Sequence, residues 1–94
     1  MPRYVIERNI PEIGSADSVA LAAAATKSNG VLAEMRAEQK QIQWEHSYVA
    51  GNKTFCIYLT GDESLIQEHS DRSGFPASTV TKVVNMIDPV TAEG

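Results

Sequence analysis

The sequence contains a single cysteine, Cys56, and few basic residues, and each scarcity excludes a class of protein. One cysteine cannot form an intrachain disulfide, so a reducing, cytoplasmic compartment is expected. Eight lysines and arginines stand against twelve aspartates and glutamates, and they are scattered along the chain. Because nucleic-acid binding needs a basic patch that neutralises phosphates, we expect no nucleic-acid partner.

Long apolar stretches are also missing. The longest run, VALAAAA, is far too short to cross a bilayer, so no membrane partner is expected. The opening MPRYVIERN has no apolar segment of the kind that secretion signals contain. With 94 residues, 43% of them apolar, the chain predicts a single domain over residues 1–94, with an ordered core at about 3–88 and a frayed end after Asp88.

What the sequence does contain is an alternation of strand and helix patterns. Strands are predicted at residues 3–9, 42–50, 53–60 and 78–88, with helices from Ser15 or Asp17 to about Arg36 and from Asp62 to Gly74. The first helix is rich in alanine, whose small side chain lets a helix lie close to a sheet. The order β-α-β-β-α-β predicts an α+β, ferredoxin-like split βαβ domain, in which two helices cover one face of an antiparallel sheet. An α+β domain with another strand order is the alternative.

The pair Gly51-Asn52 predicts a two-residue hairpin turn and with it a register. On one face, this register pairs Tyr48 with Phe55, His46 with Ile57, and Trp44 with Leu59. Because that face is the more apolar, we expect the helices to cover it. Cys56 and Tyr58 then point to the opposite face, through which we expect the chain to form a homodimer.

The two histidines are expected near one edge of the core. His69 shares a helix face with Leu65 and Ile66, and His46 lies on the strand face predicted to be covered. The ordinary interpretation is a packed, hydrogen-bonded imidazole in each case. The sharper one is a ligand or proton-transfer pair, because imidazole binds nickel, zinc and copper. The sequence has no HxxxH or CxxC spacing, and Cys56 is interpreted as a structural, unreactive thiol, since no base shares its face.

Several segments spread over residues 3–88 together resemble a known family. They are RYVIER, SNGVL, IQWEHSYVAGNKTFCIY and DESLIQEHSDRSGFPASTVTKV. The most specific pieces are W-x-H-S-Y-V, C-x-Y, and E-H followed by G-F-P, and Glu45 is the one clear departure. The chain resembles a small family formerly of unknown function, which includes dimeric nickel-binding proteins of ferredoxin-like fold.

The resemblance implies a homodimer and a divalent metal, with nickel as the cofactor. Combined with the predicted placement of the side chains, it makes His46, His69, Glu45 and Glu68 the candidate metal ligands. The favoured function is non-catalytic nickel sequestration or storage. One alternative is a small cofactor-free enzyme in which His46 or His69 is the general base, recognised by an apolar cavity beside the histidines. The other is a protein-interaction scaffold with neither metal site nor cavity.

Overall fold

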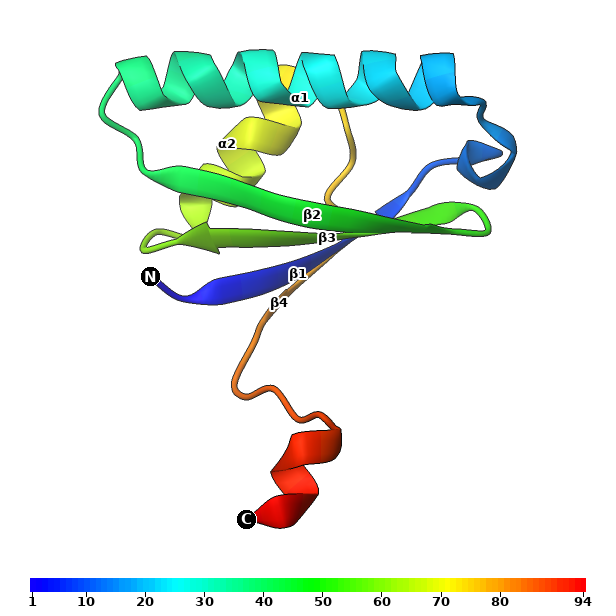
Figure 1. Cartoon of the computed structure of the whole chain (residues 1–94). Helices are drawn as coiled ribbons and strands as arrows, with labels where there is room; N and C mark the ends of the chain where they lie inside the picture. The colour runs from blue at the N-terminus through cyan, green and yellow to red at the C-terminus, as the bar shows by residue number, and fades with distance from the viewer.

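Four strands and two long helices follow one another in the predicted order (Figure 1). The computed structural model describes residues 1–94. Its elements are β1 (Arg3–Asn9), α1 (Ser18–Ala37), β2 (Ile42–Ala50), β3 (Lys53–Thr60), α2 (Ser64–Ser73) and β4 (Thr79–Lys82), with short 3-10 helices η1 (Ile13–Ser15) and η2 (Pro89–Glu93). The strands form one antiparallel sheet in the order β2-β3-β1-β4, and both helices lie on the same face. The ferredoxin-like α+β fold is therefore confirmed.

Local sequence signals set the helix ends. The Asp17 carboxylate accepts a hydrogen bond from the Ala20 N–H at 2.8 Å and caps α1. Asp62 lies just before α2, and its carboxylate accepts the Ser64 N–H at 3.0 Å. Gly74 ends α2 with φ at 81°, the left-handed conformation that glycine adopts without strain. The predicted helix boundaries therefore hold to within a residue or two.

The last strand is shorter than the predicted 78–88. Pairing between β4 and β1 ends at Lys82, opposite Tyr4, because only Arg3 of β1 lies beyond it, and the Val83 N–H makes one last hydrogen bond to the Arg3 carbonyl at 2.8 Å. The chain then leaves the sheet on the side away from the helices (Figure 1). Asp88 caps the final turn η2 by accepting the Thr91 N–H at 3.1 Å. Four apolar side chains of this tail are exposed: Val84, Met86, Ile87 and Val90.

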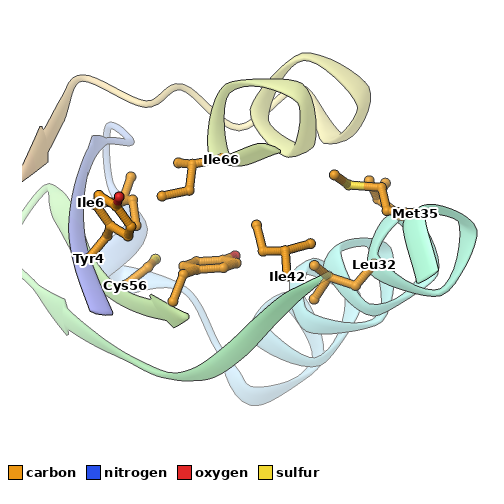
Figure 2. Close-up of a cluster of buried hydrophobic side chains, with 9 residues drawn as sticks. Tyr4, Ile6, Leu32, Met35, Ile42, Cys56 and Ile66 are labelled. Atoms are coloured by element: carbon orange, nitrogen blue, oxygen red, sulfur yellow. The ribbon is translucent and has the colours of Figure 1, made fainter. Parts of the chain in front are cut away.

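The helices cover the sheet face that carries Cys56 and Tyr58, so the prediction of the covered face was wrong. The reason lies in β1, where Tyr4 and Ile6 stand opposite Tyr58 and Cys56 and bring the apolar residues of both central strands onto one face. The core consists of Tyr4, Ile6, Val31, Leu32, Met35, Ile42, Cys56, Tyr58 and Ile66 (Figure 2). Each of these side chains that is fully buried contributes about 1.5–3 kcal/mol of hydrophobic stabilisation. Phe55, Ile57 and Leu59 lie half-buried on the opposite face, here called the open face.

A β-bulge in β2 separates two stretches of register. Tyr48 pairs with Phe55 and His46 with Ile57, as predicted. The register then shifts between Trp44 and His46, so Trp44 stands opposite Tyr58 and not opposite Leu59. The extra residue turns Trp44 toward the helices, where its indole N–H donates to the Ser47 hydroxyl at 2.9 Å.

Candidate functional site

The two histidines lie on opposite faces of the sheet, so the expectation that both approach one edge of the core was wrong. His46 is exposed on the open face, with its ring 5.1 Å from that of Tyr48 in an edge-to-face arrangement. His69 is completely buried between α2 and the covered face, where its ring lies 5.4 Å from that of Tyr58. No three histidine, cysteine, aspartate or glutamate side chains of the chain come together as a metal site.

Both candidate carboxylates already have cationic partners. Glu45 receives hydrogen bonds from the Arg3 guanidinium, and these lower the pKa of its carboxyl group. Glu68 is paired with Lys40 at 2.7 Å and with Arg72 at 2.6 Å. Glu38 binds the same two cations, and its hydrogen bonds from Arg72 and then Lys40 lower its pKa to about 2. A metal ion at either candidate carboxylate would therefore have to displace a bound cation.

His69 belongs to a buried polar network. Its Nε2 lies 3.1 Å from the Ser28 hydroxyl, whereas its Nδ1 is buried without a partner in the protein. Burial, together with the positive charge of Arg8, lowers the pKa of His69 to about 4. The imidazole is therefore neutral near pH 7. Burial likewise raises the pKa of Tyr58, so that phenol also stays neutral.

A cavity of about 250 Å³ opens between α1, the covered face of the sheet and η1. Most of its lining is apolar and includes Leu21, Trp44 and Phe75, while Arg8 and Ser28 are among its few polar residues. Ala24 and Ala25 are part of the wall that α1 contributes, so part of the alanine-rich segment borders open space where we expected close contact with the sheet. His69 does not line the cavity and reaches it only through Ser28.

Arg8 is a site residue that the sequence predictions missed. It is only 2% exposed, although it carries a permanent charge. The available signal was its position, because Arg8 shares the alternation of Tyr4 and Ile6 and so points toward the covered face. A charged residue in the inward-facing phase of a central strand indicates a buried polar site.

No helix of the chain is long and apolar enough to span a membrane.

Comparison with known proteins gives a family and a fold. A family model described as "Nickel responsive protein SCO4226-like" matches residues 4–83. The crystal structure of SCO4226 from Streptomyces coelicolor A3(2) superposes with a TM-score of 0.70, covering 90% of this chain and 99% of that one, at 16% sequence identity. That structural likeness shows the fold alone, and no curated protein matches the chain. Because the family model spans most of the sequence, the chain belongs to the SCO4226-like family of nickel responsive proteins.

Proposed function

We propose that the protein is a non-catalytic, homodimeric nickel-binding protein that holds the ion at its open face through His46. The observation that carries this proposal is the position of His46, the exposed one of two histidines, on the open face of a chain from a nickel responsive family. Imidazole is a good nickel ligand, and a sequestering site needs no further chemistry.

A second copy of the chain supplies what one copy lacks. A nickel site needs several donors, and no cluster of three exists within one chain. A residue that lies close to the axis of a twofold dimer meets its own copy there, so the proposal places His46 of both subunits beside this axis. Glu45 is next to His46 in the sequence, and its carboxylate would bind the metal after releasing its hydrogen bonds to the Arg3 guanidinium. His69 and Glu68 have structural partners on the helix side and are left out of this proposal.

The open face has the composition of a dimer interface. Phe55, Ile57 and Leu59 form an apolar row along β3, and Tyr48 beside them is 61% exposed. The tail leaves the sheet on this same side (Figure 1), and its apolar side chains are exposed. Apolar side chains left exposed on one side of a domain are typical of a protein–protein contact. The sequence analysis predicted a dimer through the other face, which carries Cys56 and Tyr58 and which the helices cover in the structure.

Calorimetric titration of the tag-free protein with nickel tests the ligand. We expect saturable binding at about one ion per two chains by wild type, loss of that binding in His46→Gln, and unchanged binding in the matched control His69→Gln. Binding should weaken as the pH is lowered, because protons compete with the metal for imidazole. The proposal fails if His46→Gln binds nickel like wild type.

Sedimentation in the presence of a chelator tests the interface separately. Wild type is expected to be a dimer, whereas Ile57→Asp should be monomeric because it buries a charge at the apolar contact. The control Ala33→Asp, on the exposed face of α1, should remain dimeric. A monomeric wild type at micromolar concentration would contradict the proposed interface.

A further inference from the structure

Arg8 is a buried cation without a counter-ion. The seven ion pairs of the chain involve other residues, so no carboxylate lies within 4.0 Å of its guanidinium. Its Nη1 donates to the Ser70 hydroxyl at 2.9 Å and to two backbone carbonyls, those of Phe75 at 3.2 Å and Pro76 at 3.1 Å. Its Nη2 is buried and has no partner in the protein. One half of the guanidinium is therefore fixed, and the other half has an unused donor.

The groups around Arg8 leave its charge uncompensated. The Tyr58 ring lies 5.8 Å from the Arg8 Cζ and contributes a weak cation–π contact. Its phenol is neutral, as is His69, whose pKa is itself lowered partly by Arg8. Cys56 and Thr54, which also line the cavity, form a contact with each other at 3.4 Å. A buried charge of this kind is costly unless an anion accompanies it.

The charge stands at the wall of a cavity that is otherwise almost entirely apolar. Arg8 lines this space together with Leu21, Trp44 and Phe75. An apolar cavity of about 150 Å³ accommodates benzene. The volume of this cavity is about 250 Å³, so it has room for a ligand of on the order of ten non-hydrogen atoms. Apolar walls with one placed charge are typical of sites for small amphipathic ligands.

We propose that this cavity binds a small apolar monocarboxylic acid, with its carboxylate on the Arg8 guanidinium and its hydrocarbon body against α1 and Trp44. A carboxylate matches the fork of donors that a guanidinium presents and supplies the missing negative charge. The apolar walls favour a hydrocarbon body over a sugar or a phosphate ester. This inference is independent of the nickel proposal, because the cavity lies on the other side of the sheet from His46.

Two probe acids of suitable size are octanoate and phenylacetate. Binding is measured by calorimetry and by the fluorescence of Trp44, which is the single tryptophan of the chain and lines the cavity. We expect saturable binding of at least one acid by the metal-free wild type. The uncharged phenylacetamide should bind at least tenfold more weakly than phenylacetate, and acetate, which has no apolar body, should not saturate.

Two variants examine the charge and the space separately. Arg8→Met keeps an unbranched, flexible stem but removes the guanidinium and its charge, so it should reduce acid affinity at least tenfold and abolish the preference over the amide. Ala25→Leu fills the cavity from α1 and should remove binding of every probe. Arg36→Met and Ala33→Leu are the matched controls on the exposed surface of α1, and both should bind like wild type.

The outcomes are decisive in either direction. If neither acid binds saturably to wild type, or if the amide binds as well as the acid, the proposal is overturned even where Arg8→Met fails to fold. Acid binding that survives in both Arg8→Met and Ala25→Leu would also overturn it, by placing the site elsewhere on the surface.

Discussion

Mild acid will destabilise this protein, and His69 is the cause. The pKa of His69 is about 4 in the folded chain, against about 6.5 for an unperturbed histidine. Between these two values the unfolded chain binds more protons than the folded one, so stability falls as the pH is lowered from about 6.5 to about 4. Below about pH 4 both forms are protonated and the loss stops growing. For these two pKa values the loss between pH 7 and pH 5 is about 2 kcal/mol.

Urea unfolding followed by Trp44 fluorescence measures this effect. For a domain of this size, with a urea dependence of about 1–2 kcal/mol per molar, the midpoint should fall by about 1–2 M between pH 7 and pH 5. His69→Gln should be less stable at pH 7, because it disturbs the bond to Ser28, but its stability should be nearly flat over this pH range. His46→Gln, which changes an exposed imidazole, should keep the wild-type pH dependence. The reasoning is refuted if His69→Gln loses as much stability on acidification as wild type does at the same protein concentration.

Three further predictions concern stability. Gly14→Ala should lower the free energy of unfolding, measured by chemical denaturation, by about 1–3 kcal/mol, because the new Cβ would lie 2.5 Å from the carbonyl oxygen of Gly51. Gly30→Ala should raise it by about 0.5–1 kcal/mol, because a Cβ at this position of α1 meets nothing within 4 Å. If Gly30→Ala proved the less stable of the two variants, the packing of η1 on the hairpin would be contradicted. Ile66→Ala should lower the free energy of unfolding by about 2–5 kcal/mol, because Ile66 is 1% exposed in the core, and a loss below 1 kcal/mol would show that α2 is not docked as described. Because the pKa of Glu38 is lowered to about 2 in the folded chain, its stabilising contribution is present above about pH 4.5 and is lost as the pH falls toward 2. Glu38→Gln should therefore lack this second loss of stability in acid. If the stability of Glu38→Gln below pH 4.5 fell as it does in wild type, Glu38 would not be the group responsible.

The element order could be predicted because its signals are local. Asp17 as a helix cap, Gly51-Asn52 as a hairpin turn and Gly74 as a helix end each act within a few residues, and all three hold in the structure. The covered face of the sheet is not a local property. The hairpin alone favoured Phe55 and its neighbours, while the pairing with Tyr4 and Ile6 of β1, which lies far away in the sequence, decided for the other face.

The candidate site was harder to predict for two physical reasons. The bulge at Glu45 changes which side chains of β2 share a face, and the pattern of polar and apolar residues along β2 does not predict an inserted residue. The cavity is the space left between elements, so it depends on how α1 sits over the sheet and not on any one motif. Arg8 could have been found from alternation alone, but only once the covered face was known. No observation tests the four predicted metal ligands, which are His46, His69, Glu45 and Glu68. Of the two imidazoles, that of His46 is the more accessible, because His69 is buried.

The bulge in β2 also bears on how the protein avoids aggregation. β2 is the outer strand of the sheet and is nine residues long, so its unpaired backbone edge would offer a template on which strands of other molecules could add. The irregularity between Trp44 and His46 interrupts the even spacing of N–H and C=O groups on which such addition depends. Removing Glu45 would straighten this edge and favour open-ended strand addition, the first step toward fibres. The same inserted residue that turns Trp44 toward the cavity thereby makes this edge a poorer template for a fifth strand.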